Sequence, residues 1–330
     1  MNKIILGIET SCDDTAVALV NSEGQILSSV IASQIDIHNE FGGIYPEFAA
    51  RAHITSILPT IHEALKQAQI GKDEISAIAI TRGPGLIGSL LVGINTAKGL
   101  AMGWNKPLIG INHLRGHLRS VDLEQKRLIY PATILLVSGG HTFLAYMKNE
   151  TDIKLLGSTL DDSVGECYDK VARMLGLTYP GGPVVDKLAK EGTANISFPQ
   201  PVMNKGLAFS FSGLKSAVAR YLESNQNAVK VDVAASFVKT VIEILMKKSK
   251  KALKDFPSNS FAMVGGVSAS LQIREAAAIM CKEKNVELCL PPLRWSTDNA
   301  AMIALAAFDY LKLNILKPAT SDLFLTIEDF

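Results

Sequence analysis

One succession of elements occurs twice along the chain, and it constrains the fold more than any other feature. Near the start, an apolar run at residues 4–8 is followed by a polar turn at 9–14 and a β-branched run at 15–20. The same order recurs at residues 134–137, 138–141 and 142–147. Each set predicts a β-hairpin. A third strand is predicted after each hairpin, at 25–31 and at 153–156.

A second unit is also repeated further along each half. An apolar strand at 76–81 leads through a glycine turn into a helix at 86–102 and a strand at 107–111. In the second half, a strand at 261–264, the turn Gly265-Gly266, a helix at 268–284 and a strand at 286–290 follow in the same order. Hairpins combined with strand–glycine–helix units predict mixed sheets in a duplicated α/β fold, with a ligand between the halves.

The predicted domains follow from this duplication. Residues 1–130 form the first half, with the C-terminal region 299–330 expected to pack back on it. Residues 131–298 form the second half and carry an inserted segment at 157–216. A length of 330 residues suits two domains of ordinary size.

Composition excludes several classes of protein. With 48% hydrophobic residues and a formal net charge of +1, the chain is neither disordered nor able to coat nucleic acid by bulk electrostatics. Its four cysteines show no paired metal or disulfide spacing, which indicates a reducing compartment. Glu9, Asp13 and Asp14 interrupt the first apolar run too early for a signal peptide. We therefore expect a cytoplasmic protein with no membrane span.

Two histidines follow the strand at 107–111. His113 and His117 are spaced i, i+4, which places both on one face of a helix; a metal pair and two exposed helix residues fit this spacing equally well. A zinc protease of the H-E-x-x-H type is excluded, because Leu114 occupies the position of its glutamate. Asp298 follows the matching strand of the second half, and a pseudo-twofold axis would bring it opposite the histidines. Two histidines and one carboxylate are typical of non-haem Fe²⁺, with Zn²⁺ or Mn²⁺ as alternatives.

Glycine turns form a second candidate site. Gly139-Gly140 and Gly265-Gly266 each follow a strand, where backbone N–H groups without neighbouring Cβ atoms can bind an anion. Neither turn matches a full phosphate-loop or dinucleotide-binding pattern, so a plain tight turn is the alternative for each. Together the two turns suggest a nucleotide. Asp169 and Asp186 could accept hydrogen bonds from ribose hydroxyls, although an aspartate on a helix is usually a surface charge.

The longer motifs resemble one known family over residues 4–306. The matching stretches are GIETSCDDTAVALV, GGIYPEFAARAHI, TRGPGLIGSLLVG, NHLRGHL, LLVSGGHT, GECYDKVARMLGL, YPGGP, FSFSGLKSAV, VGGVSAS and STDNAAMIA. In this respect the chain is similar to the universal tRNA N6-adenosine threonylcarbamoyltransferases, a family earlier described as O-sialoglycoprotein endopeptidases. The resemblance implies the duplicated fold of actin, sugar kinases and heat-shock ATPases. It also implies transfer of the threonylcarbamoyl group from threonylcarbamoyl-adenylate to N6 of the adenosine 3′ of the anticodon, in tRNAs that read codons beginning with A, with release of AMP.

The resemblance also implies residue roles. The metal ligands would be His113, His117 and Asp298, holding one divalent ion, Fe²⁺ first and Zn²⁺ or Mn²⁺ second. The adenylate contacts would be Leu136, Val137, Ser138, Gly139, Gly140, Asp169, Gly182, Asp186 and Ser270. Our own hypothesis is that Asp13 relays the proton lost from N6, against the alternative of a purely structural turn. The family's bacterial members work with a paralogous dimerisation partner and a small ATPase, which we expect here too.

Three positions depart from the family pattern. Arg115 stands where glutamate is usual, Ser270 where asparagine is common, and Ser296 where cysteine often stands. The shorter Ser270 puts its adenylate contact in doubt. Two alternative functions are a kinase or ATPase of the same fold and a non-catalytic paralogue. The set of two histidines and one aspartate disfavours both. A lysine-rich run at 247–254 is a candidate tRNA patch, although a solvated helix face is the simpler interpretation.

Overall fold

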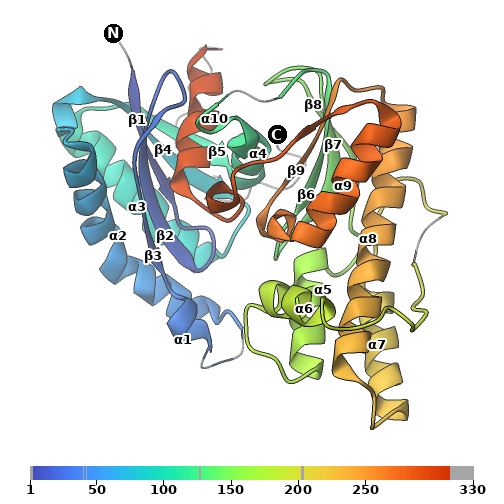
Figure 1. Ribbon diagram of the computed structural model, residues 1–330. Helices are drawn as coiled ribbons and strands as arrows, with labels where there is room; N and C mark the ends of the chain where they lie inside the picture. The colour runs from blue at the N-terminus through green and yellow to red at the C-terminus, as the bar shows by residue number, and fades with distance from the viewer. Residues whose placement is uncertain (1–2, 40, 42, 126–127, 202–203, 313–330) are drawn as a thin grey trace. The chain divides into compact units, whose positions relative to one another are not determined.

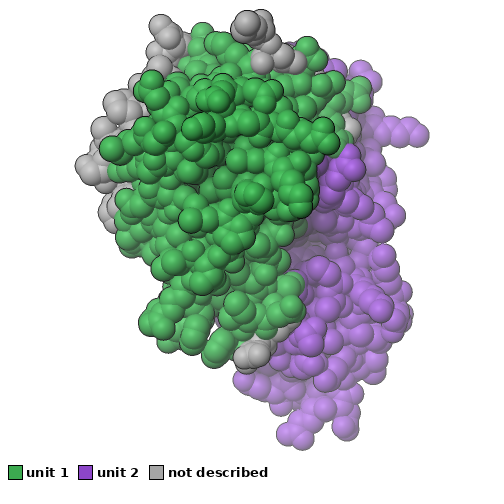
Figure 2. Space-filling view, turned by 90° about the vertical axis from the view of Figure 1, so that its left-hand side faces the viewer, with its two compact units in different colours: residues 1–127, 297–330 green, residues 128–296 purple. Residues whose placement is uncertain are grey.

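The computed structural model describes residues 3–39, 41, 43–125, 128–201 and 204–312 (Figure 1). The chain folds into two compact units, residues 1–127 with 297–330 and residues 128–296. Figure 2 shows them in separate colours. The part of the expected C-terminal region beyond residue 312 lies outside the described residues.

The first unit contains a five-stranded mixed sheet in the order β3-β2-β1-β4-β5. Its strands are β1 (Ile4–Glu9), β2 (Asp14–Asn21), β3 (Ile26–Ser33), β4 (Ile75–Gly83) and β5 (Leu108–Asn112). The first three strands pair antiparallel, and β1–β4 and β4–β5 pair parallel. The predicted hairpin, third strand and strand–glycine–helix unit are therefore parts of one sheet.

The sheet of the second unit has the corresponding order, β8-β7-β6-β9-β10. Its strands are β6 (Ala132–Val137), β7 (Thr142–Met147), β8 (Ile153–Ser158), β9 (Ser260–Val264) and β10 (Glu287–Cys289). The antiparallel and parallel pairings also correspond strand by strand to those of the first sheet. The repetition seen in the sequence is thus a repetition of topology, and the predicted fold class is confirmed.

Alternation along β1 assigns the two faces of the first sheet. Leu6 and Ile8 belong to a core formed with α2 (Pro46–Ala68) and α3 (Ile87–Trp104). Gly7 points to the other face, where a Cβ atom would lie 2.9 Å from the Cβ of Ala304 on α10 (Ala300–Lys312). Because successive side chains of a strand point to opposite faces, the glycine at position 7 allows α10 to approach the sheet closely.

The remaining helices are shorter or belong to the second unit. The first unit also has α1 (Ile35–Asn39) and α4 (His113–Arg119), with 3₁₀ turns at Lys72–Glu74 and Ser120–Asp122. The second unit has α5 (Val164–Met174), α6 (Gly181–Ala189), α7 (Ser212–Ser224), α8 (Lys230–Asp255) and α9 (Leu271–Lys284), with 3₁₀ turns at Gly266–Ala269 and Leu293–Trp295. Apolar residues of α5 to α9 share one core with the strands β6, β7 and β9.

The helix predicted at 268–284 begins later than expected. Residues Gly266–Ala269 form a 3₁₀ turn, and α9 starts at Leu271 behind Ser270, whose hydroxyl accepts a hydrogen bond from the Ile273 N–H. A serine in that position is a favourable N-cap, and it fixes the true start of the helix. No described helix combines the length and apolarity needed to cross a membrane.

Candidate functional site

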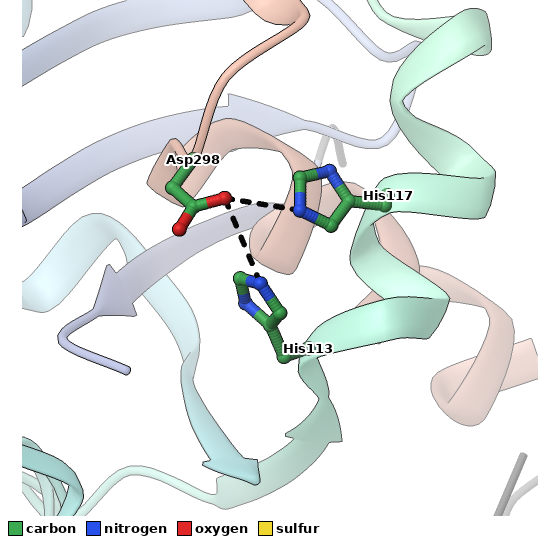
Figure 3. A group of neighbouring side chains, drawn as sticks. All are labelled: His113, His117 and Asp298. Atoms are coloured by element: carbon green, nitrogen blue, oxygen red, sulfur yellow. Dashed lines mark ion pairs between the residues drawn. The ribbon is translucent and has the colours of Figure 1, made fainter. Parts of the chain in front are cut away.

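Three side chains of the first unit converge at the point where β5 ends and α10 begins. His113 is the first residue of α4, His117 lies one turn later, and Asp298 immediately precedes the turn into α10 (Figure 3). One ligand atom from each of the three residues lies within 4.8 Å of the other two. The Asp298 Oδ1 is 3.0 Å from the Nε2 of His117 and 3.6 Å from the Nε2 of His113.

Asparagine side chains cap α4, which carries the two histidines, and α10, which Asp298 precedes. The Asn112 Oδ1 accepts hydrogen bonds from the N–H groups of Leu114 and Arg115, which caps α4. The Asn299 Oδ1 accepts from the Met302 N–H, 2.9 Å away, and its amide donates to the Thr297 carbonyl. His113 and Asp298 therefore each stand beside a helix cap that fixes the local backbone.

A buried carboxylate orients the first histidine. The Glu9 Oε2 lies 2.9 Å from the Nδ1 of His113, and its two oxygens also accept from the Ser11 N–H and the Thr81 hydroxyl. With Nδ1 held by Glu9, the Nε2 atom is the one available on the side of Asp298. Burial acts to lower the pKa of His113, but the charges of Glu9 and Asp298 outweigh it and raise the pKa to about 9.

This donor set fits a divalent metal. Both ring nitrogens of His117 are buried and neither has a hydrogen-bond partner among the described residues, while its Nε2 lies 3.0 Å from the Asp298 Oδ1. Two imidazole nitrogens and one carboxylate oxygen form the ligand set typical of Fe²⁺, and Zn²⁺ and Mn²⁺ are competitors. The predicted grouping of His113, His117 and Asp298 as a potential metal site is confirmed, whereas the metal's identity stays a prediction.

Asp13 lies in the turn between β1 and β2. It is partly buried, and this burial, followed by the charge of Asp298, raises the pKa of its carboxyl group. Its neighbour Asp14 is also raised by burial, to a pKa of about 6. His53 on α2 fixes this turn, because its Nε2 donates to the Cys12 carbonyl at 2.9 Å while its Nδ1 accepts from the Thr15 hydroxyl at 2.7 Å.

The predicted nucleotide-binding residues all lie in the second unit, where contacts connect them. Leu136 and Val137 end β6, and the turn of Ser138, Gly139 and Gly140 follows. Gly265 has a φ angle of +89° and passes so close to this turn that a Cβ atom would lie 2.5 Å from the Val137 carbonyl oxygen. A side chain at position 265 would therefore separate the two glycine turns.

The helices α5 and α6 bring the remaining candidates to the same turn. The Ser138 carbonyl accepts from the Gly165 N–H at the start of α5, and the Asp169 Oδ1 accepts from the Gly181 N–H at 2.7 Å. The carboxylate of Asp186 accepts a hydrogen bond from the Tyr168 hydroxyl at 3.4 Å. The departure at Ser270 has a structural consequence, since its hydroxyl caps α9 by accepting from the Ile273 N–H.

Three glycines among the candidates border open space. An added Cβ would meet nothing within 4 Å at Gly139, Gly140 or Gly182. By contrast, Gly165 and Gly181 are needed for packing, because their added Cβ atoms would lie 2.5 Å from the Ser138 carbonyl oxygen and 2.6 Å from the Asp169 Cα. Backbone N–H groups beside open space can approach a phosphate or a nucleobase.

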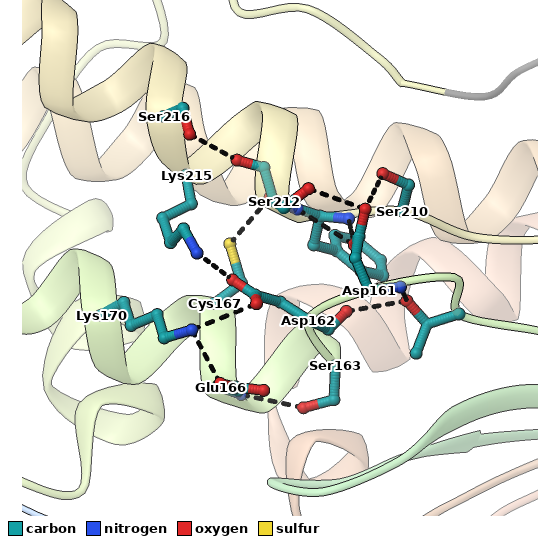
Figure 4. Close-up of polar contacts among 12 residues, drawn as sticks. Asp161, Asp162, Ser163, Glu166, Cys167, Lys170, Ser210, Ser212, Lys215 and Ser216 are labelled. Atoms are coloured by element: carbon teal, nitrogen blue, oxygen red, sulfur yellow. Dashed lines mark hydrogen bonds and ion pairs between the residues drawn. The ribbon is translucent and has the colours of Figure 1, made fainter.

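The inserted segment contains a polar cluster that supports this site (Figure 4). Asp161 accepts from the N–H groups of Phe211 and Ser212 and from the hydroxyls of Ser210 and Ser212. Asp162 forms ion pairs with Lys170 at 3.1 Å and Lys215 at 2.6 Å. These contacts join α5 to the start of α7, so the conspicuous aspartate pair and FSFSGLK motif stabilise the framework.

The lysine-rich run does not form a uniform basic face. Lys248 is buried, and its ammonium donates to the Gly206 carbonyl. Lys250 pairs with Glu283 and Lys251 with Asp255, each at 2.7 Å. The solvated-face interpretation is therefore the better one for residues 247–254.

Comparisons with known proteins give one family. The model of the tRNA N6-adenosine threonylcarbamoyltransferase family matches residues 25–305. A protein of this name from Thermosipho africanus is 49% identical, with 96% of this chain and 97% of the relative aligned. One from Clostridium botulinum is 48% identical, with 93% of each chain covered.

Solved structures of other proteins share the fold. Component A of (R)-2-hydroxyglutaryl-CoA dehydratase from Acidaminococcus fermentans aligns with a TM-score of 0.57 at 16% identity, covering 94% of this chain and 99% of that one. HypF from T. kodakarensis aligns with a TM-score of 0.66 at 14% identity, covering 98% of this chain and 49% of that one. At such low identity these likenesses concern the fold alone.

Proposed function

The chain belongs to the tRNA N6-adenosine threonylcarbamoyltransferase family and catalyses that modification of tRNA, and from this premise we propose a donor, an acceptor position and a role for each candidate residue. The donor is threonylcarbamoyl-adenylate, and the acceptor is N6 of the adenosine 3′ of the anticodon in tRNAs that read codons beginning with A. The convergence of His113, His117 and Asp298 is the observation on which the site assignment chiefly rests.

The reaction is an acyl transfer from a mixed anhydride. The N6 amine attacks the carbamoyl carbon, a C–N bond forms, the bond from that carbon to the phosphate oxygen breaks, and N6 loses a proton. AMP leaves with the electron pair of the broken bond. The site must therefore stabilise a developing negative charge on the carbonyl oxygen and on the leaving phosphate.

His113, His117 and Asp298 hold the metal in this proposal, and Fe²⁺ is the first candidate. When bound, the ion supplies Lewis-acid polarisation of the carbonyl group and an anchor for the phosphate. Glu9 keeps the Nδ1 of His113 engaged, so that the Nε2 atom remains directed toward the ligand set.

The turns of the second unit hold the adenylate. In this proposal Leu136, Val137, Ser138, Gly139 and Gly140 contact the adenylate, and open space borders Gly139, Gly140 and Gly182, the last at the start of α6. Asp169 and Asp186 supply carboxylates for ribose hydroxyls. Ser270, whose hydroxyl caps α9, also contacts the adenylate in this proposal.

Asp13 accepts the proton lost from N6. Its raised pKa makes it a stronger base than an exposed aspartate, and it lies in the turn that follows β1. An Asp13→Ala variant that retains the full transfer rate would remove Asp13 from the mechanism.

Partners and location belong to the same proposal. We expect a paralogous dimerisation partner and a small ATPase of the bacterial threonylcarbamoyladenosine system, and a cytoplasmic location. These partners supply part of the tRNA-binding surface.

Reconstitution tests the proposed function. The chain is incubated with tRNA, threonine, bicarbonate, ATP, the adenylate synthase and the partners, and the digested nucleosides are analysed. We expect modified adenosine with the unaltered chain and with His62→Ala, which changes an exposed histidine of α2, and none with His117→Ala. No product above the enzyme-free control would refute the assignment, and an unaffected rate in His117→Ala would refute the metal site.

A further inference from the structure

Buried charged groups connect the two helices that carry the ligand set. Arg119 on α4 places its Nε 2.9 Å from the Oδ2 of Asp309 on α10 and also forms an ion pair with Asp122. The Nη2 of Arg115 lies 4.0 Å from the same Asp309 oxygen. The side chains of all four residues are at most 6% exposed.

Packing on the same face leaves little freedom between these helices. A Cβ atom at Gly116, between the two histidines, would lie 2.7 Å from the Cδ1 of Ile303 and 3.1 Å from the Cγ of Met302. The guanidinium group of Arg115 also lies 4.8 Å from the ring centre of Tyr310. The helices α4 and α10 are therefore in contact along their length, at Gly116 by close packing and at Asp309 by charge.

The position of α10 relative to α4 bears directly on the ligand geometry. His113 and His117 move with α4, and Asp298 is joined to the first turn of α10 through the Asn299 cap. A small rotation or slide of one helix against the other would alter the distances from Asp298 Oδ1 to the two Nε2 atoms. A metal site loses affinity when its ligands are not held in place by supporting contacts.

We propose that Asp309 is a positioning residue of the metal site: together with Arg115 and Arg119 it fixes α4 on α10 and thereby keeps the three ligand atoms converged. Buried ion pairs of this kind contribute little net stability compared with apolar groups of similar size, so a role in fixing a geometry accounts for the presence of this one. The inference rests on the proposed metal site.

The test measures Co²⁺ binding to the full chain. The dissociation constant is measured by competition with a chelator, and the visible absorption of bound Co²⁺ reports the coordination geometry. Asp309→Asn removes the shared carboxylate charge. The double variant Arg115→Met with Asp309→Asn removes one positive and one negative charge and leaves the Arg119–Asp122 pair intact. Circular dichroism and thermal unfolding verify the fold of each variant.

A matched control removes an equivalent pair elsewhere. Lys148→Met with Asp152→Asn deletes an exposed i, i+4 pair of the second unit, where the side chains are 64% and 51% exposed. We expect Co²⁺ to bind this control as it binds the unaltered chain. In the folded double variant we expect about 10-fold weaker binding, the lower end of the loss caused by removing outer-shell contacts, with an altered absorption spectrum.

The measurements can contradict either the positioning role of Asp309 or the metal site itself. An unchanged dissociation constant and spectrum in the folded double variant would overturn the positioning role. If Asp309→Asn alone does not fold, the double variant carries the test, and Arg115→Lys, which keeps the charge, is expected to lose less affinity than either. Equal binding to the unaltered chain and to His117→Ala would instead contradict the metal site itself, so the two failures are distinguishable.

Discussion

At the scale of single residues, a substitution of Glu9 tests how His113 is oriented while leaving the three candidate metal ligands in place. Glu9→Gln keeps a hydrogen-bonding group near the Nδ1 of His113 but removes the charge. We expect the affinity for Co²⁺ to fall about 10- to 100-fold, as in other metal sites that lose a partner of a ligating histidine. Chelator competition at one fixed pH measures the loss.

Glu223→Gln is the matched control, because Glu223 is exposed at the end of α7 in the other unit. It should bind the metal like the unaltered chain. If Glu9→Gln bound equally well, the orienting role of Glu9 would be wrong even though its geometry is suitable.

Asp14 predicts a pH dependence of stability. Burial raises the pKa of its carboxyl group from 3.8 to about 6, so the folded state binds this proton more tightly than the unfolded state. The resulting stabilisation is present below the unfolded pKa and is lost as the pH rises through about 6. Solvent weakens this effect, because the carboxyl group is partly exposed. We therefore expect the free energy of unfolding of Asp14→Asn, relative to that of the unaltered chain, to be about 1–2 kcal/mol higher at pH 7.5 than at pH 4.5.

Urea unfolding of the chelator-treated protein at the two pH values measures this difference. Asp73→Asn, at an exposed site, should show no such pH dependence. An Asp14→Asn variant that changes stability equally at both values would contradict the raised pKa.

Residue type and spacing were sufficient to predict a group of three residues that could hold a metal, but not the contacts that position this group. His113 and His117 are marked by their i, i+4 spacing, and Asp298 by its place after a matching strand. The only signal for Glu9 is a charge that ends an apolar strand, which many surface turns share. Its role depends on the contact with His113, 104 positions away, and no local pattern encodes such a distance.

At the scale of elements, the cap of α4 is predicted to couple helix stability to metal binding. Asn112→Ala removes the acceptor for the Leu114 and Arg115 N–H groups, and a lost N-cap costs about 1 kcal/mol. Since His113 directly follows this cap, we expect weaker Co²⁺ binding as well as a lower free energy of unfolding. Asn227→Ala, at an exposed position, is the control for both measurements. Lower stability with undiminished metal affinity would show that the cap acts on the helix alone.

Two glycines of the second unit are predicted to respond differently to the same substitution. Gly182→Ala should fold normally, because an added Cβ meets nothing within 4 Å, and yet weaken adenylate binding by filling open space. Gly265→Ala should be destabilised by about 1–3 kcal/mol, because the residue has a positive φ angle and touches the Val137 carbonyl. Calorimetric titration with AMP and thermal unfolding measure the two effects. Gly103→Ala, also with open space, controls for the gain in helix propensity. Unweakened AMP binding by Gly182→Ala would argue against its contact with the nucleotide.

Element prediction succeeded where the pattern was local. The strand β7 was predicted with its observed bounds, since apolar periodicity and flanking polar residues define it. The start of α9 was placed too early because the sequence pattern does not distinguish the 3₁₀ turn at Gly266–Ala269 from the α-helix that follows it. The buried position of Lys248 in α8 could not be predicted, because it depends on the carbonyl of Gly206, which is distant in sequence.

At the scale of the whole molecule, the near-neutral charge predicts weak binding of tRNA by the isolated chain. The formal charge is only +1, and within the lysine run Lys248 is buried while Lys250 and Lys251 are paired with acidic side chains. We expect binding that weakens steeply between 50 and 200 mM salt and improves when the partners are added. Fluorescence anisotropy with labelled tRNA measures both. Tight binding by the chain alone at about 150 mM salt would contradict this division of labour.

The duplication was the most predictable property of the whole chain. Two hairpins and two strand–glycine–helix units in the same order are sufficient to predict two equivalent mixed sheets, because connections between such elements follow few topologies. The inserted segment was harder to interpret. Its aspartates and serines have the composition of a reactive site. In the structure, however, Asp161 accepts hydrogen bonds at the start of α7, and Asp162 forms ion pairs with two lysines.

The return of residues 297–312 to the first unit has a consequence for biosynthesis. The helix α10 covers the face of β1 at Gly7, and Asp298 completes the ligand set begun by His113. A ribosome makes Gly7 nearly 300 residues before its cover, and it makes the whole second unit in between. The nascent chain can therefore fold its second unit before its first unit is complete, and His113 and His117 gain Asp298 as a neighbour only after the whole second unit has been made.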